Sequence, residues 1–289
     1  MINQKFDIYT MVTEKIIDGL NAGTIPWRRT WKGGAAPMNY KTKKPYKGVN
    51  RLLLSLTPYE QPYFLTYKQA LEVGGQIKKG AKSLPIVFWK WVYKDDNGKS
   101  CDPAVAATKF AYGRYYRVFN IQDTEGIPFP VNGSNTQNTP IQECENIWNN
   151  WTKKPDINHG GNEAYYSPRQ DVIQIPNFQD FDSAETYYST LFHEAVHATG
   201  HSTRLNRDGV TNLAKFGDHS YSKEELVAEI GAAFLCYQTG IEQNVLQNQT
   251  AYIQHWLKKL QDDHKLIYSA AKQAEEAAKC ISHSGSLLR

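Results

Sequence analysis

Residues 187–201 read YYSTLFHEAVHATGH, and this stretch carries the strongest structural signal in the chain. Its apolar spacing predicts a helix over residues 187–199. Two histidines four positions apart, His193 and His197, lie on the same face of such a helix, one turn from each other. Their imidazoles can therefore bind one tetrahedral zinc ion, with Zn–N distances of about 2.0–2.1 Å. Glu194 lies beside that position, where it can act as a general base on a water molecule.

A catalytic zinc site needs a third protein ligand and keeps its fourth position for water. Residues 221–229, YSKEELVAE, predict the start of a second helix. Glu225 and Glu229 share one face of that helix. We predict Glu225 as the third ligand and Glu229 as the carboxylate that orients a ligand histidine, while the reverse assignment stays open. His201 is a weaker alternative ligand, because the glycine before it favours a turn.

A five-residue HExxH pattern also occurs by chance on helices whose histidines are ordinary polar residues. Three features favour catalysis here: the amphipathic helix, the candidate third ligand at the start of another helix, and a hairpin that precedes both. The hairpin is predicted to join residues 164–166 to residues 172–175, and it can serve as an edge strand for a substrate. We therefore predict a catalytic site with one Zn²⁺ per chain, and Tyr221 as a candidate hydrogen-bond donor to the oxyanion.

The composition is that of a globular protein. The chain has 289 residues, 40% of them hydrophobic and 12% aromatic, which is enough for two domains with their own cores. No stretch approaches the roughly 18 apolar residues of a transmembrane helix, so no membrane partner is expected. The N-terminus shows no secretory signal pattern, which predicts a cytoplasmic protein. The four cysteines are scattered, without CxxC spacing, and indicate neither a disulfide framework nor a metal clip.

Charge is divided unevenly along the chain. Residues 1–130 hold 20 lysines and arginines against 10 acidic residues, a net charge of +10, whereas residues 131–289 hold 13 against 19, a net charge of −6. The first stretch also holds 20 of the 36 aromatic residues. Basic charge interleaved with aromatic rings favours a surface for a polyanion with flat bases. The alternative is a solvated basic face over an ordinary aromatic core.

The basic half predicts an α+β domain with a small antiparallel sheet. Apolar spacing indicates a helix over residues 5–22 and a short helix that ends at Gly74. Two runs rich in β-branched and aromatic residues, 85–93 and 110–119, predict strands. The sequence DDNG at 95–98 supplies a turn between them.

Residues 120–142 are rich in glycine, proline, serine and asparagine, which is typical of turns and linkers. The charge changes sign in the same place. We therefore predict a first domain over residues 1–130, a linker over 131–142 and a second domain over 143–289. Helices are expected in the second domain over residues 143–153, 182–200, 222–240 and 248–280.

Two clusters in the basic half mix cations with aromatic rings. A single strand of DNA exposes phosphates and base faces, which proteins bind with basic grooves and aromatic platforms, each stacked base being worth about 1–3 kcal/mol. A single tryptophan is more often a core residue, but the interleaving favours DNA binding. No zinc-finger, helix-turn-helix or RRM signature indicates base-specific readout. The residues predicted to bind single-stranded DNA are Trp27, Arg28, Arg29, Trp31, Lys32, Asn39, Lys41, Lys43, Lys44, Tyr46, Lys47, Asn50 and Arg51.

Along nearly its whole length, the chain resembles the ArdC-type antirestriction proteins of conjugative plasmids and other mobile elements. The N-terminal resemblance lies in GTIPW (23–27), Trp31, Asn39, YKGVN (46–50), Gly74-Gly75 and KKG (78–80). The C-terminal resemblance lies in FHEAVHATGH (192–201), RLNR (204–207) and EELVAE (224–229). It implies a domain that binds single-stranded DNA, a zincin-like metallopeptidase domain, and protection of incoming plasmid DNA from restriction. The Glu-x-x-Ala-Glu spacing is similar to that of gluzincin-type enzymes, which favours Glu225 as the zinc ligand.

We therefore expect a two-domain α+β protein that binds single-stranded DNA without sequence specificity and hydrolyses an unidentified peptide or protein. One alternative is a DNA-coating protein whose metal domain is structural and inactive. The intact Glu194 speaks against it, because a structural site needs no base. Another alternative is a metal-dependent nuclease, but two-metal nucleases use clustered carboxylates rather than a pair of histidines at this spacing.

Overall fold

The computed structural model describes residues 7–22, 25, 36–55, 57, 59, 61–128, 140–211, 219–241 and 249–282. The α-helices are α1 (Ile8–Asn21), α2 (Gly48–Ser55), α3 (Tyr67–Glu72), α4 (Pro140–Asn150), α5 (Ala184–Thr199), α6 (Asp208–Thr211), α7 (His219–Thr239), α8 (Gln249–Asp262) and α9 (Leu266–Ser282). The strands are β1 (Met38–Asn39), β2 (Tyr63–Leu65), β3 (Gln76–Ile77), β4 (Leu84–Lys94), β5 (Thr108–Asn120), β6 (Thr124–Glu125), β7 (Asp156–His159), β8 (Tyr165–Ser167) and β9 (Val172–Ile175).

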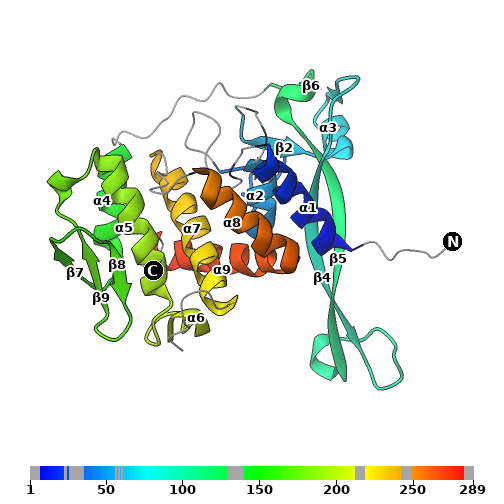
Figure 1. The fold of residues 1–289 in the computed structure, drawn as a ribbon. Coiled ribbons are helices and arrows are strands. Elements are labelled where there is room, and N and C mark those ends of the chain that lie inside the picture. Colours follow the sequence, from blue (N-terminus) through cyan, green and yellow to red (C-terminus); the bar gives the residue numbers. More distant parts are fainter. Residues whose placement is uncertain are drawn as a thin grey trace.

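The N-terminal half is built on a four-stranded sheet with the order β1-β2-β5-β4. The two predicted strands form its longest pair, an antiparallel β4–β5 ribbon in register from Leu84 opposite Val118 to Lys94 opposite Thr108. The root of the ribbon is buried at Ile86 and Val118. Its far end extends away from the rest of the molecule (Figure 1). The predicted antiparallel pairing is therefore confirmed, and β1, which pairs parallel with β2, is the exception in this sheet.

Two long helices form the centre of the C-terminal half. Helix α5 is capped by Ser183, whose side chain accepts a hydrogen bond from the Thr186 backbone N–H, and 12 of its 16 residues are buried. It packs against α7, and a Cβ added at Gly231 of α7 would lie 2.8 Å from Cγ2 of Val196. The absence of a side chain at Gly231 therefore allows the close approach of the two helices.

A three-stranded sheet with the order β7-β9-β8 lies beside α5. The predicted hairpin is confirmed as β8 and β9, which pair antiparallel. The pairing of β7 with β9 is parallel, and the periodicity of the sequence did not indicate this strand. Strand β8 forms one edge of the sheet.

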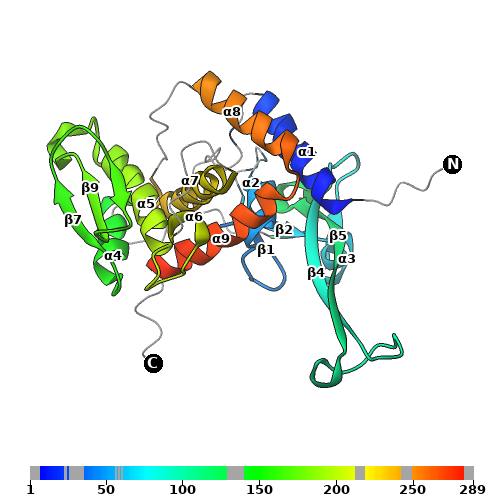
Figure 2. The ribbon, with the colours of Figure 1, turned by 60° about the horizontal axis from the view of Figure 1, so that its bottom comes forward.

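The two halves pack against each other through a shared hydrophobic cluster. Helix α1 contacts α8, and α2 contacts α9, so the first and last parts of the described chain lie side by side (Figures 1 and 2). One cluster of buried residues runs through both halves, from Val12 and Leu52 to Phe192 and Ile267. The division of the chain at residues 131–142 stays a prediction.

The single helix predicted over residues 248–280 is wrong, because the structure breaks it into α8 and α9. At the break, the Asp263 side chain accepts a hydrogen bond from the Lys265 backbone N–H at 2.8 Å. The carbonyl oxygen of His264 accepts one from the Thr13 hydroxyl of α1, also at 2.8 Å. A short aspartate that bonds the backbone two residues ahead favours a turn over a helix.

Among the helices that the described residues form, none combines the length and the apolar character that a membrane span requires.

Candidate metal centre

The two histidines of α5 point at one common position. The Nε2 atoms of His193 and His197 lie 3.2 Å apart. Two ligands bound at about 2.0–2.1 Å in tetrahedral directions are about 3.3 Å apart, so the spacing fits two nitrogens that share one metal ion. Helix geometry produces this arrangement, since residues i and i+4 lie one above the other.

Glu225 approaches the same position from the first half of α7. Its carboxylate oxygens lie 3.7 Å from Nε2 of His193 and 3.6 Å from Nε2 of His197. The three ligand atoms fall within 4.8 Å of one another, and the three side chains are partly accessible to solvent. Two imidazoles and one carboxylate around an accessible point are a donor set that suits a divalent metal ion with an open coordination position.

Glu194 lies in the wall of the same cavity, which has a volume of about 370 Å³. The residue is only 7% exposed, so its carboxylate is held among other groups rather than in bulk water. The lining also includes Tyr165 and Tyr166 of the edge strand β8. The cavity therefore extends from the metal-ligand cluster to an edge strand.

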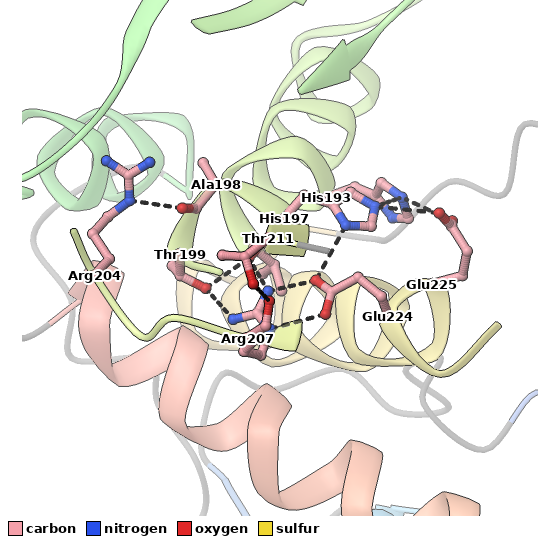
Figure 3. A network of polar contacts seen from close by, with 10 residues as sticks. His193, His197, Ala198, Thr199, Arg204, Arg207, Thr211, Glu224 and Glu225 are labelled. Carbon is pink, nitrogen blue, oxygen red and sulfur yellow. Dashed lines mark hydrogen bonds and ion pairs between the residues drawn. The ribbon is translucent and has the colours of Figure 1, made fainter. Parts of the chain in front are cut away.

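A carboxylate that the sequence analysis did not single out orients His197. Glu224 Oε1 lies 3.3 Å from Nδ1 of His197, on the side of the ring away from the cluster. Arg207 donates to both oxygens of Glu224, at 2.9 and 2.5 Å, and also donates to the Thr199 hydroxyl at 2.6 Å (Figure 3). Glu224 and Arg207 are both buried. A buried chain of polar groups therefore holds the ring of His197 in place.

The acidic surroundings of the cluster appear in the pKa values of its histidines. Burial alone would lower the pKa of His193, but the hydrogen bond with Glu225 and the charges of Glu194 and Glu229 raise it to about 10. Burial likewise opposes the charged form of His197, and contact with Glu224 raises its pKa. A field that favours a positive charge on these rings also favours a bound cation.

The other residues predicted for this site lie in different positions. His201 follows the end of α5, where its Nδ1 bonds the Thr203 hydroxyl at 2.8 Å, and it is not part of the ligand cluster. Glu229 acts on His193 through its charge, and its orienting role stays a prediction. The side chain of Tyr221 lies outside the described residues. The sequence prediction missed Glu224, because it assigned the ligand and orienting roles to Glu225 and Glu229, which share one face of the helix.

Five of the predicted DNA-binding residues, Trp27, Arg28, Arg29, Trp31 and Lys32, lie outside the described residues. Of the remaining eight, four lysines are exposed: Lys41, Lys43, Lys44 and Lys47. Lys41 forms an ion pair with Glu72 at 2.6 Å, and the ammonium of Lys43 lies 3.9 Å from the centre of the Tyr40 ring. Asn39 is half-buried and bonds Gln69 at 3.0 Å.

Three further predicted DNA-binding residues have partners within the protein, and their contact with DNA stays a prediction. Asn50 is buried and bonds both the N–H and the carbonyl of Val87, each at 2.7 Å, so its amide joins α2 to β4. The guanidinium of Arg51 donates to the Phe234 carbonyl at 3.1 Å and lies 4.0 Å from the centre of that ring. Tyr46 is buried among the residues of a small cluster. The polar groups of Asn50 and Arg51 are bonded within the protein, because α2 packs on β4 through Asn50 and reaches α7 through Arg51.

Comparison with known proteins assigns both halves. The N-terminal domain of anti-restriction factor ArdC matches residues 6–119, and a zincin-like metallopeptidase domain matches residues 143–273. The protein y4eC of Sinorhizobium fredii (strain NBRC 101917 / NGR234) is 31% identical over 94% of this chain and 90% of its own length. A DNA primase TraC of Escherichia coli is 35% identical over 96% of this chain, but the chain spans only 27% of that relative.

Solved structures of the antirestriction protein ArdC from the R388 plasmid have the same fold. The metal-free structure superposes with a TM-score of 0.78 at 33% identity, over 98% of this chain and 100% of the other. A Mn(II)-bound structure superposes with a TM-score of 0.77 over the same shares. The predicted two-domain α+β architecture is therefore confirmed, and a relative of the same fold binds a divalent metal. The chain belongs to the ArdC family of antirestriction proteins, with an ArdC-type N-terminal domain and a zincin-like metallopeptidase domain.

Proposed function

We propose that the protein is a mobile-element antirestriction factor that binds single-stranded DNA without sequence specificity and carries a zinc-dependent peptidase site. The convergence of His193, His197 and Glu225 within 4.8 Å, beside the buried Glu194, carries the peptidase part of this proposal. A site that only stabilised the fold would need neither a cavity in front of the ligands nor a carboxylate in its wall.

The donor set favours zinc held by His193, His197 and Glu225. When bound there, the metal supplies Lewis acidity to a water molecule and to the scissile carbonyl. Glu194 takes the proton of the attacking water at its carboxylate and delivers it to the leaving amine. Glu224 fixes the ring of His197 through Nδ1, so that Nε2 stays directed at the cluster.

Strand β8 supports a peptide as the substrate. It is an edge strand of its sheet, and Tyr165 and Tyr166 line the cavity that contains Glu194. An extended peptide can add to such an edge through main-chain hydrogen bonds, which place its carbonyl groups along the cavity. Specificity then comes from the side chains around the cavity, and the substrate is a peptide or protein segment in extended form.

The charge of the first half supports DNA binding. Residues 1–130 carry a net charge of +10 together with 20 aromatic residues. Phosphates bind to cations whatever the base sequence, and every base has a face that can stack on a ring. This combination favours unpaired DNA over duplex, because paired bases cannot reach a protein ring.

The proposal is tested by separating metal binding from hydrolysis in the full chain. Glu194→Gln should keep one zinc per chain and lower the rate of peptide hydrolysis by roughly 10²–10⁴-fold, because the base is not a ligand. Glu163→Gln, an exposed carboxylate near β8, serves as the matched control. Plasmids that encode each variant are then transferred into a restricting recipient. Hydrolysis that is absent in the parent protein, with full protection of the plasmid, would favour the DNA-coating alternative.

A further inference from the structure

A second cavity lies in the basic half, between the segment that leads into α2 and the root of the β4–β5 ribbon. Its volume is about 720 Å³, within the ~300–1,000 Å³ range of small-molecule sites. The described residues that line it include two lysines and no carboxylate, whereas three glutamates line the cavity at the metal centre. The two cavities therefore favour ligands of opposite charge.

Two aromatic rings form one wall of this cavity. Phe88 is 50% exposed and Tyr116 is 45% exposed, and their ring centroids lie 5.6 Å apart at an angle of 76°. Tyr116 stands opposite Ile86 in the ribbon, and side chains two positions apart on a strand share a face, so both rings lie on the same side. Rings that are half exposed at the mouth of a cavity offer flat apolar surface to a ligand.

Polar groups form the rest of the wall. Lys44 and Lys47 line the cavity and are exposed, in contrast to Lys41, which is paired with Glu72. The amides of Asn39 and Gln69 also line it, bonded to each other at 3.0 and 3.4 Å. These groups match the parts of a nucleotide. The lysines suit its phosphate, the aromatic rings suit the face of its base, and the amides suit the polar edge of its base.

We propose that this cavity holds an unpaired nucleotide of single-stranded DNA, with its base stacked on Phe88 and Tyr116 and its phosphates bound by Lys44 and Lys47. The inference rests on the proposed DNA-binding function and gives it a location. A paired base cannot enter without being unpaired and unstacked from its duplex, so the cavity favours single strands.

From the cavity, the bound DNA continues along the same face of the β4–β5 ribbon. Arg114 stands directly opposite Phe88, and Phe110 stands opposite Val92, two alternations further toward the far end. The ammonium of Lys94 lies 5.5 Å from the centre of the Phe110 ring. Cations and rings therefore alternate from the cavity to the exposed end of the ribbon, which projects from the molecule (Figure 2).

Photocrosslinking locates the DNA directly. The full-length protein is irradiated with an oligothymidylate that carries 5-iodouracil, and the crosslinked peptides are identified by mass spectrometry. Crosslinks at Phe88 or Tyr116 are expected, because an excited iodouracil reacts with a stacked aromatic ring. Crosslinks confined to other parts of the chain would overturn the location.

Variants of the same full chain measure the contribution of each group. Phe88→Ala should weaken binding of the oligothymidylate about 5- to 150-fold with an unchanged salt slope, and Phe88→Trp should restore it. Lys47→Gln should instead flatten the salt slope by about 0.7. The matched control is Trp91→Ala, because Trp91 is 51% exposed on the opposite face of the ribbon and should bind as the parent does.

The outcomes separate this inference from the function on which it rests. If the parent protein does not bind the oligothymidylate, the proposed DNA-binding function fails. If the parent binds, and Phe88→Ala and Tyr116→Ala bind equally well while their thermal melts stay normal, only the location fails. An equal loss in Trp91→Ala would also overturn the location, because it would place the DNA on both faces of the ribbon.

Discussion

The two ring nitrogens of His197 face different partners, and this arrangement directs one of them at the candidate metal position. Nε2 faces His193 and Glu225, whereas Nδ1 lies 3.3 Å from Glu224. Burial raises the pKa of the Glu224 carboxyl, whereas the hydrogen bonds from Arg207 lower it. The net effect is a lowered pKa. Glu224 therefore stays ionised and keeps Nδ1 as the donor, which leaves Nε2 free to act as a ligand.

The ligand assignment leads to a test at single residues. The parent protein should hold one zinc per chain, and His193→Ala or Glu225→Ala should remove most of it, because each takes away one of three ligands. Metal content per chain is measured by elemental analysis after dialysis. The control Glu229→Gln should retain the metal. Full occupancy in Glu225→Ala, together with loss in Glu229→Gln, would reverse the assignment.

Glu224 should be important both for the fold and for the metal. Glu224→Ala leaves the buried Arg207 without its carboxylate, which should cost about 3–5 kcal/mol of unfolding free energy. It should also weaken metal affinity roughly 10–100-fold, since His197 loses its orienting partner. Chemical denaturation and metal titration measure the two effects. Lys223→Ala, one position earlier on the same helix, is the control, and equal effects there would exclude a specific role for Glu224.

At the scale of elements, the spacing of α5 and α7 brings the ligands together. Val196 lies between the two ligand histidines in the sequence, and its methyl groups occupy the space that a side chain at Gly231 would need. Six residues before Gly231, the same helix carries Glu225. The helix–helix contact therefore sets how closely the carboxylate approaches the imidazoles.

Gly231→Ala should separate the two helices. The added Cβ would lie 2.8 and 2.9 Å from the methyl carbons of Val196, which is closer than packed carbon atoms allow. We expect a loss of about 1–3 kcal/mol in unfolding free energy and a weaker affinity for zinc. Denaturation and metal titration measure both. Val196→Ala in the same chain removes the clashing methyls and should restore the metal affinity, and failure of this rescue would show that another contact sets the spacing.

The turn of the β8–β9 hairpin is tied to the segment after α5 by Asp171 and Arg204. Arg204 donates to both oxygens of Asp171, at 3.0 Å for Oδ2, and to the Tyr166 hydroxyl at 3.1 Å. Burial opposes ionisation of Asp171, but its hydrogen bonds to Arg204 and Tyr166 lower its pKa below the usual 3.8. The pair therefore stabilises the edge strand beside the metal centre while Asp171 is ionised.

This lowered pKa predicts how stability depends on pH. A carboxyl whose pKa is lower in the folded than in the unfolded protein contributes stability above a pH of about 3.8. This contribution is lost as the pH falls through the pKa of the folded state. The difference in unfolding free energy between the parent and Asp171→Asn should therefore be constant near neutral pH and shrink in acid. Denaturation curves over a pH series measure it. A difference that grew toward low pH would contradict the lowered pKa.

At the scale of the whole molecule, one hydrophobic cluster joins the basic N-terminal half to the half that carries the candidate metal centre. Arg51 of α2 reinforces the junction, because its guanidinium bonds the Phe234 carbonyl of α7 and lies 3.8 Å from Glu275 of α9. Helix α7 also carries the ligand Glu225. Helix α2, whose Asn50 lines the cavity at the root of the ribbon, is therefore bonded through Arg51 to the helix that carries Glu225.

The shared cluster predicts that the two halves stay together without a covalent connection. A protease site is inserted between residues 131 and 142, and the cleaved protein is analysed by size-exclusion chromatography. The two pieces should elute together, because apolar surface of both halves is buried in one core. Arg51→Ala should weaken the association, whereas Lys68→Ala, an exposed cation of α3, should not. Separate elution of the parent pieces would contradict a shared core.

Local sequence patterns determined many of the helices and strands and two of the three ligands of the candidate metal centre, but they missed β7 and the break between α8 and α9. His193 and His197 converge because the α-helix alone places residues four apart on one face, and the β4–β5 and β8–β9 pairs follow from runs of strand residues around short turns. The uneven distribution of charge between residues 1–130 and 131–289 can likewise be read from the sequence alone. The tertiary structure decided which glutamate faces the histidines, since Glu224, Glu225 and Glu229 differ only in how α7 lies against α5. It also buried Asn50, bonded Arg51 to α7 and placed Phe88 and Lys44 around one cavity. These contacts join segments far apart in the chain, and their geometry depends on packing that no local pattern records.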